Sequence, residues 1–279
     1  MMGTRQLQRV INAQPAADGD GVKILRIAGA GLFAEIDPFL LLDEIRSEDG
    51  ADYMGGFPPH PHRGFETITY MLEGAMRHRD HMGNEGVIGP GDVQWMTAGR
   101  GVIHSEMPEQ SDGLLHGFQL WLNLPAAQKM QPAAYQEFKR KDIPVVAPAE
   151  GVRIAVIAGR LELDEIAVTG PVSERSTHPT YLDMNLGGGA VIDLPVDPGQ
   201  TALVRVFAGD IEGVAQGQMG LYANGDTIRL AAGPDGARLL VLLATPIREP
   251  IAQRGPFVMN TPQEIEQAMR DYAQGRLLA

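Results

Sequence analysis

Cysteine is absent from this 279-residue sequence. Its absence excludes disulfides, thiolate nucleophiles, zinc fingers and iron–sulfur clusters, so any metal must be held by histidine and carboxylate side chains. Basic residues are also few, because 23 lysines and arginines stand against 35 aspartates and glutamates, which gives a formal net charge of -12. The positive charge that attracts nucleic acid and anionic membranes is therefore missing, and direct nucleic-acid binding is not expected.

Long apolar runs are missing too. Residues 1–21 contain no run that resembles a signal peptide, and no later segment approaches the ~20 apolar residues of a membrane span. We therefore expect a cytoplasmic protein without a membrane segment. The length favours two domains, at about 150 residues for each. The 44% of residues that are hydrophobic can fill their cores.

The sequence does contain many short runs that are rich in β-branched and aromatic residues, separated by 34 glycines and 20 prolines. Examples are residues 65–72, 92–98, 117–123, 201–209 and 237–244. Short runs with frequent turn residues are typical of an antiparallel β protein, either a sandwich or a barrel.

One segment near the C-terminus has the pattern of a helix. Thr261 suits the N-cap, Pro262 the first helical position, and Glu264 completes a capping box. The following apolar residues recur at helical spacing on one face: Ile265, Ala268, Met269 and Tyr272. We predict a helix over residues 261–277 that docks on the second domain.

The chain divides near its middle. Residues 125–150 are rich in Pro, Ala, Gln and Lys, as expected of a connection, which predicts domains at 1–140 and 141–279. Gly74 and Gly91 in the first half are separated by nearly the same number of residues as Gly209 and Gly225 in the second half. This agreement supports a duplicated β-barrel.

Two short segments of the first half carry most of the chemistry. His60 and His62 are two residues apart, and His104 and Glu106 are also two apart. Residues i and i+2 of a strand share a face, so each pair can point the same way. Two such pairs on neighbouring strands would offer three imidazole nitrogens and one carboxylate, a set that suits Fe, Mn, Co, Ni, Cu or Zn better than Mg or Ca.

Each of these signals has a simpler alternative. An isolated His-x-His pair is more often solvated or hydrogen-bonded than bound to a metal, and Glu66 competes with Glu106 for the carboxylate position. The remaining histidines are predicted to be structural: His78 and His81 fall in a charged strand and are expected at the surface, while His116 and His178 lack evident partners.

Several longer segments together resemble the pirin family. Residues 59–74 are similar to the first cupin motif as pirins carry it, and residues 92–108 to the second. Residues 37–45 and 117–125 support the resemblance, which is close over about residues 20–125 and looser toward the C-terminus. It implies an all-β fold of two tandem cupin domains, which are antiparallel jelly-roll-type barrels, with the predicted helix at the C-terminal end.

The resemblance also implies a metal site. One divalent transition metal, expected to be Fe(II), would lie in the N-terminal barrel only, bound by the residues that match the pirin ligands: His60, His62, His104 and Glu106. In general cupins the first-motif glutamate is a ligand, whereas in pirins this role passes to the glutamate two residues after the third histidine. Glu66 is therefore expected beside the metal rather than on it.

The internal repeat is consistent with a second domain that binds no metal. The positions equivalent to the four ligands are occupied by Pro195, Asp197, Arg238 and Leu240.

The activity implied by the resemblance is that of a metal-dependent dioxygenase of the quercetinase type. Such an enzyme cleaves a flavonol such as quercetin with O2 and releases carbon monoxide and a depside. Glu106 or Glu66 would accept the proton of the flavonol hydroxyl. Two alternatives stay open: a redox-responsive regulator that acts through protein partners, and an enzyme for another phenolic or enolisable compound.

Overall fold

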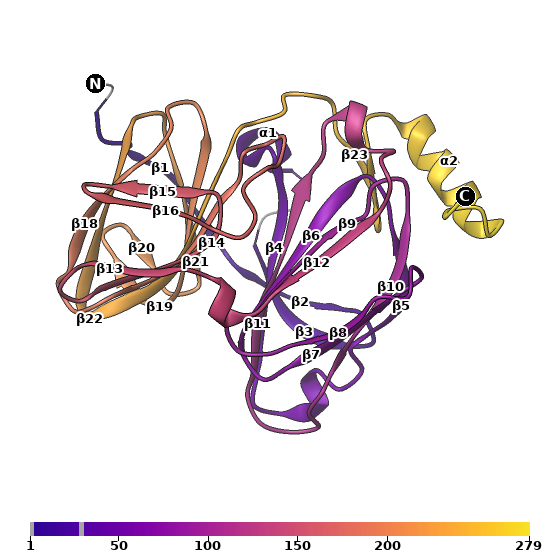
Figure 1. The fold of residues 1–279 in the computed structure, drawn as a ribbon, viewed down its shortest axis with the longest axis horizontal. Helices are drawn as coiled ribbons and strands as arrows, with labels where there is room; N and C mark the ends of the chain where they lie inside the picture. The colour runs from indigo at the N-terminus through magenta and orange to yellow at the C-terminus, as the bar shows by residue number, and fades with distance from the viewer. Residues whose placement is uncertain (1–2, 28–30) are drawn as a thin grey trace. The chain divides into compact units, whose positions relative to one another are not determined.

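The computed structural model describes residues 3–27 and 31–279, and these form two compact units built from antiparallel strands (Figure 1). Among the described residues, the first unit consists of residues 14–27, 31–33, 39–140 and 247–279, and the second consists of residues 3–13, 34–38 and 141–246. These units differ from the predicted domains 1–140 and 141–279. The C-terminal segment belongs to the first unit, and the N-terminal segment belongs to the second.

The first unit contains a seven-stranded sheet in the order β12-β9-β6-β11-β4-β3-β2 and a four-stranded sheet in the order β5-β10-β7-β8. The strands of the large sheet are β2 (Gln14–Asp18), β3 (Val22–Ile27), β4 (Phe39–Ser47), β6 (Phe65–Glu73), β9 (Val93–Thr97), β11 (Leu115–Asn123) and β12 (Ala134–Phe138). Those of the small sheet are β5 (Phe57–His62), β7 (Met76–Asp80), β8 (Glu85–Ile88) and β10 (Val102–Pro108).

Cross-strand partners place one continuous line of polar side chains across the large sheet of the first unit. Direct neighbours in a ladder project from the same face, so the register of six successive strands defines this line. We call it the polar row, and its members are Arg26, Asp43, Gln119, Thr69, Gln94 and Glu137.

An apolar layer flanks the polar row on the same face. This layer contains Ile24, Ile45 and Met71. These residues pack in one cluster with Met76 of β7 and Ile88 of β8 in the small sheet. The face that carries the polar row is therefore the inner face, turned toward the small sheet. Alternation along each strand sends the intervening residues to the opposite face.

The second unit contains a nine-stranded sheet with the path β1-β21-β19-β22-β17-β14-β13, to which β18 and β20 pair at its side, and a separate hairpin. The sheet strands are β1 (Leu7–Asn12), β13 (Val145–Ala149), β14 (Val152–Ala158), β17 (Thr180–Leu186), β18 (Val191–Pro195), β19 (Thr201–Ile211), β20 (Val214–Ala215), β21 (Gln218–Tyr222) and β22 (Thr227–Ala244). The hairpin is formed by β15 (Arg160–Leu163) and β16 (Ile166–Thr169).

The core of the second unit is built almost wholly from Leu, Ile and Val side chains. Its ladders also define a line of direct cross-strand neighbours, Val156, Leu182, Val241 and Val204, and all four belong to the buried core. We call this line the aliphatic row.

Short elements complete the chain. Two strands near the C-terminus, β23 (Ala252–Arg254) and β24 (Phe257–Met259), form a hairpin in the first unit. The helical elements are α1 (Phe33–Ile36), α2 (Pro262–Ala273) and the 3₁₀ turns η1 (Gly50–Asp52), η2 (Ala126–Gln128) and η3 (Arg140–Asp142). Within the described ranges, neither α-helix has the length or the apolar character to cross a membrane.

The predicted C-terminal helix is confirmed, although it ends earlier than residue 277. Thr261 and Glu264 form the capping box, and Pro262 occupies the first turn. The prediction that this helix docks on the second domain is wrong. Ile265 and Ala268 pack against neighbours in the first unit, namely Phe257, Met259 and Leu277. Tyr272, predicted on the buried face, is 43% exposed.

Candidate metal centre

The small sheet of the first unit brings the two predicted ligand pairs together. Strands β5 and β10 are antiparallel neighbours, and His104 lies directly opposite His60 in their register. Ligand atoms of His60, His62 and His104 lie within 4.8 Å of one another. The two-residue spacing within β5 and the pairing of β5 with β10 therefore bring three imidazoles close together, as a metal site requires.

The nitrogens of His60 and His62 are arranged as two adjacent metal ligands would be. His60 Nδ1 lies 2.8 Å from the carbonyl oxygen of Pro58 and donates to it, so His60 Nε2 is unprotonated and has a free lone pair. That lone pair is 3.0 Å from His62 Nε2. Two nitrogens at right angles around an ion with bonds of about 2.1 Å would be separated by about 3.0 Å.

His104 provides an independent test of whether the site suits a metal. Its Nε2 is buried and has no hydrogen-bond partner among the described residues. Burial lowers the pKa of both His104 and His62 well below the ordinary value for histidine, and the neighbouring imidazoles lower both pKa values further. Both rings are therefore neutral at physiological pH, and neutral imidazole is the form that binds metals. The donor set fits a divalent transition metal.

Glu106 supplies a carboxylate next to these rings. One of its oxygens lies within 4.8 Å of ligand nitrogens of His78 and His104. Its Oε1 accepts a hydrogen bond of 2.9 Å from Thr69, and its Oε2 accepts one of 3.0 Å from Gln119. Both donors belong to the polar row, so the large sheet fixes the orientation of a carboxylate that the small sheet carries.

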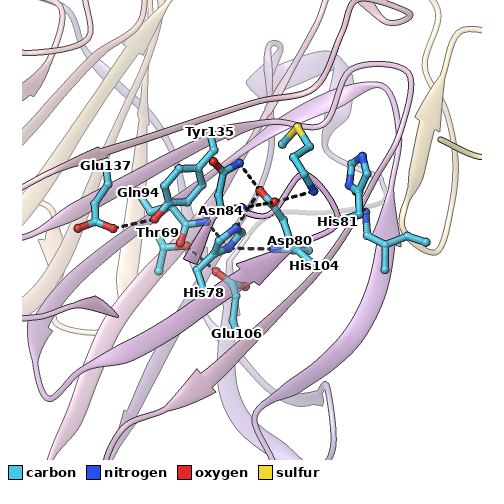
Figure 2. A network of polar contacts seen from close by, with 12 residues as sticks. Thr69, His78, Asp80, His81, Asn84, Gln94, His104, Glu106, Tyr135 and Glu137 are labelled. Atoms are coloured by element: carbon cyan, nitrogen blue, oxygen red, sulfur yellow. Dashed lines mark hydrogen bonds and ion pairs between the residues drawn. The ribbon is translucent and has the colours of Figure 1, made fainter. Parts of the chain in front are cut away.

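His78 is the main difference from the sequence-based prediction. It was expected at the surface, but its side chain is 1% exposed. Figure 2 shows its ring between His104, Gln94 and Asp80. His78 Nδ1 lies 3.4 Å from His104 Nδ1 and 3.0 Å from Gln94 Nε2, and His78 Nε2 lies 3.3 Å from Asp80 Oδ2.

These contacts determine which nitrogens carry protons. A carboxylate accepts only, so His78 Nε2 donates to Asp80 and His78 Nδ1 is left as an acceptor. Gln94 Nε2 donates to His78 Nδ1 at 3.0 Å, and His104 Nδ1 shares this acceptor as the weaker donor at 3.4 Å. His104 Nε2 then keeps the free lone pair that a metal would use. A carboxylate–histidine chain behind a ligand imidazole fixes its tautomer and raises its basicity.

The partners of His78 are themselves held in place. Asp80 accepts from the backbone nitrogens of Met82 and Asn84 and from the Asn84 side chain. The ring of Tyr135 stacks on His78 with 4.6 Å between centroids, and its hydroxyl donates to Glu137 (Figure 2). The sequence contained a signal for this arrangement, because Arg77 and Arg79 alternate with His78 and Asp80 along β7.

Glu66 does not face the other site residues. It is three positions from Thr69 on β6, so the two side chains project from opposite faces of the strand. Its Oε1 accepts a hydrogen bond of 2.6 Å from Thr97, whose side chain also lies on that face. Since Thr69 holds Glu106, the expectation that Glu66 lies beside the metal does not fit this geometry.

Three further histidines lie outside the cluster. His81 and His178 are exposed. His116, for which the sequence suggested no partner, is buried and pairs through Nε2 with Glu44 Oε1 at 2.9 Å.

A cavity of ≈ 520 Å³ within the first unit is lined by three of the predicted ligands, His60, His62 and Glu106. This volume lies within the range of small-molecule sites. Its polar lining includes His60, His62, Glu106, Gln119, Arg26, Asp43 and Asp18. Its apolar lining includes Ile24, Leu41, Ile45, Phe57, Trp121 and Pro256. The cavity can therefore hold a largely apolar molecule with a few polar groups.

The sequence is similar to those of known proteins over nearly its whole length. Residues 21–122 match the Pirin family model, and residues 181–278 match the model of the Pirin C-terminal cupin domain. A pirin-like protein of Caulobacter vibrioides is 45% identical over 99% of this chain and 100% of its own length. The chain belongs to the pirin family. Human pirin, another member, is 37% identical over 98% of this chain and 93% of its own length.

A solved structure shows the same fold. Quercetin 2,3-dioxygenase from Acinetobacter baumannii superimposes with a TM-score of 0.90 at 34% identity, covering 99% of both chains. The predicted fold of two cupin domains with a C-terminal helix is thereby confirmed for this member of the pirin family.

Proposed function

We propose that this chain is a metal-dependent dioxygenase of the pirin and quercetinase type, which cleaves a flavonol with O2 and releases carbon monoxide and a depside. The observation that carries the proposal is the position of the site. Ligand atoms of His60, His62 and His104 lie within 4.8 Å of one another, and a Glu106 oxygen lies within 4.8 Å of His104. His60, His62 and Glu106 line a ≈ 520 Å³ cavity whose walls are partly apolar. The quercetin 2,3-dioxygenase that shares its fold at 34% identity supports this choice.

The residues that would hold the metal are His60, His62, His104 and Glu106. We propose Fe(II), which the pirin resemblance suggests and which imidazole and carboxylate ligands accommodate. When bound, the metal would supply Lewis-acid activation and a path for electrons. The other tasks belong to the chain itself.

The cavity walls would bind and orient a flat aromatic molecule. Trp121 and Phe57 border the cavity close to the ligands, and the Trp121 ring lies 5.3 Å from that of His62. Leu41 and Ile45 continue the apolar wall. Burying an aromatic ring against such surfaces is favourable and displaces water from the site.

Glu106 is the carboxylate placed to accept a proton. A flavonol hydroxyl that reaches the ligand cluster would lose its O–H proton to a carboxylate oxygen of Glu106, and the negative charge would remain on the flavonol oxygen. Thr69 and Gln119 hold both oxygens of this carboxylate, so it is oriented before substrate arrives. Glu66 projects from the other face of β6, and we assign it no proton-transfer role.

The test combines metal analysis with turnover. Purified protein is loaded with Fe(II) without oxygen, its metal content is measured, and O2 is then added with a flavonol while carbon monoxide is recorded. We expect about one metal per chain and carbon monoxide release that is lost in Glu106→Ala but kept in Glu66→Gln. One metal per chain without turnover of any flavonol would contradict the proposal and favour a regulatory role through protein partners.

A further inference from the structure

The polar row extends past Gln119, which holds Glu106, to Arg26, which lines the same cavity. Arg26 lies at the β3 end of the row, and both Arg26 and the ligand histidines line the cavity. Strand β3 is two strands away from β11, where Gln119 holds Glu106. At about 4.8 Å between neighbouring strands, the two positions are roughly 10 Å apart. This distance is comparable to the length of a two-ring aromatic molecule.

The guanidinium of Arg26 is fixed along two of its edges. Its Nε donates to Asp43 Oδ1 at 2.8 Å, and its Nη2 donates to Asp43 Oδ2 at 2.6 Å and to Asp18 Oδ2 at 2.7 Å. Its Nη1 has no hydrogen-bond partner among the described residues, and the side chain is 33% exposed. A rigid arginine with unused N–H donors beside a cavity is organised to bind an oxygen atom.

The local charge selects the kind of oxygen. One guanidinium stands against the carboxylates of Asp18 and Asp43, so the cluster carries a net negative charge. A carboxylate or phosphate on the ligand would be repelled. A phenolic hydroxyl suits both partners, because it can accept from Arg26 Nη1 and donate to Asp18, whose side chain is 50% exposed.

We propose that Arg26 and Asp18 form a subsite for hydroxyl groups on the pendant phenyl ring of the flavonol. The subsite makes the protein selective for flavonols that are hydroxylated on this ring. This inference rests on the proposed function and adds its specificity. Asp43 acts as a positioning residue, since it holds the guanidinium through two hydrogen bonds.

The experiment compares two flavonols and matched variants. Quercetin and galangin share a flavonol core, and quercetin alone has two hydroxyls on the pendant phenyl ring. Their dissociation constants are measured by titration calorimetry without oxygen, on metal-loaded protein. A hydrogen bond to a charged group corresponds to about tenfold or more in affinity. We expect the wild-type protein to bind quercetin about tenfold more tightly than galangin.

Arg26→Lys retains a positive charge for Asp43 but cannot hold two carboxylates and a ligand together. We expect it to weaken quercetin binding by about tenfold, to leave galangin binding within about twofold, and so to abolish the preference. Asp18→Asn, at an exposed side chain, should reduce the preference without affecting folding. Arg77→Lys is the control, because Arg77 is also 33% exposed and also pairs with two carboxylates, Glu85 and Glu109, but does not line the cavity.

The possible outcomes separate this inference from the proposed function. An unchanged quercetin-to-galangin ratio in Arg26→Lys, with carbon monoxide still released from quercetin, overturns the subsite alone. An equal loss of affinity for both flavonols assigns Arg26 a structural role and also overturns it. Failure of both flavonols to bind the wild-type protein overturns the subsite and the proposed function together.

Discussion

The large sheets of the two units each carry a line of direct cross-strand neighbours on the inner face, and the two lines have opposite character. The polar row of the first unit contains Arg, Asp, Gln, Thr and Glu side chains. The aliphatic row of the second unit contains only Val and Leu, packed in a core built mostly from Leu, Ile and Val. The inner face of the large sheet is therefore polar in the first unit and forms an apolar core in the second.

In the first unit, buried polar side chains occupy row positions that aliphatic side chains occupy in the second unit. Buried polar groups are costly unless each is hydrogen-bonded, so a polar row is retained only where a ligand or reaction needs it. In the first unit the apolar packing lies beside the row, around Ile24, Ile45 and Met71, and in the C-terminal segment around Phe257 and Ile265. The second unit needs no such arrangement, because its aliphatic row is itself core.

The largest expected effect on stability comes from placing a charge in the aliphatic row. Val241→Asp would bury an unpaired carboxylate at a position that is 0% exposed. We expect a loss of more than ~4 kcal/mol in the free energy of unfolding, measured by urea denaturation. Val191→Asp is the control, since Val191 is 44% exposed and lies on β18 of the same unit. Similar losses in the two variants would contradict the contrast between the rows.

The next largest effect should come from removing a metal ligand. His62→Ala removes one of the four proposed donors, and we expect metal retention to fall by more than ~100-fold, since even changes behind the ligands cost 10–100-fold. Elemental analysis after dialysis measures the loss, and circular dichroism should show an unchanged β fold. His81→Ala, at an exposed histidine of the same unit, should keep its metal. Full metal content in His62→Ala would rule out the site as described.

A smaller effect should follow from the group behind His104. His78→Phe keeps a ring against Tyr135 but removes both nitrogens that contact His104 and Asp80. We expect metal affinity to weaken by about 10–100-fold, measured by competition with a chelator. An affinity equal to that of the wild type would show that the contact between His78 and His104 does not contribute to metal binding. A loss as complete as that in His62→Ala would show that His78 is itself a ligand.

The smallest expected effect concerns a charge buried away from the site. Lys129 donates to Gly64, Asn123 and Val258, and burial lowers its pKa to about 8, although Glu249 and Glu264 act in the opposite direction. An unfolded lysine has a pKa near ~10.4, so between these two values the unfolded chain binds more protons than the folded one.

The free energy of unfolding should therefore rise with pH in this window, by about 1 kcal/mol between pH 8 and pH 9. Urea denaturation at each pH measures the slope, and Lys129→Met should lack this contribution. The same slope in both proteins would refute the assignment.

Much of the fold was predictable because it depends on local patterns. Alternating apolar residues and frequent turns predict antiparallel strands, and the capping box at Thr261 and Glu264 predicts where α2 begins. The two ligand pairs were predictable for the same reason, since residues two apart on a strand share a face. The pairing of β5 with β10, which brings the pairs together, is a long-range contact that spacing alone does not determine.

The errors have physical causes. His78 was expected at the surface because its neighbours along β7 are charged, but alternation places those charges on the other face. Glu66 fits the general cupin pattern, yet its strand parity directs it away from Glu106. The apolar face of α2 predicts that the helix docks somewhere but not on which unit. The polar row could not be predicted from the sequence, because its members come from six strands that become neighbours only in the folded sheet.

The interleaving of chain segments has a consequence for biosynthesis. Ribosomes make proteins from the N-terminus, and domains generally fold as units once their residues have emerged. The first unit needs residues 247–279, which provide Pro256 in the cavity wall and Asp271, the partner of Arg63 next to His62. The strands that carry the predicted ligands are thus synthesised well before residues 247–279, and their unit is completed only after those residues are made.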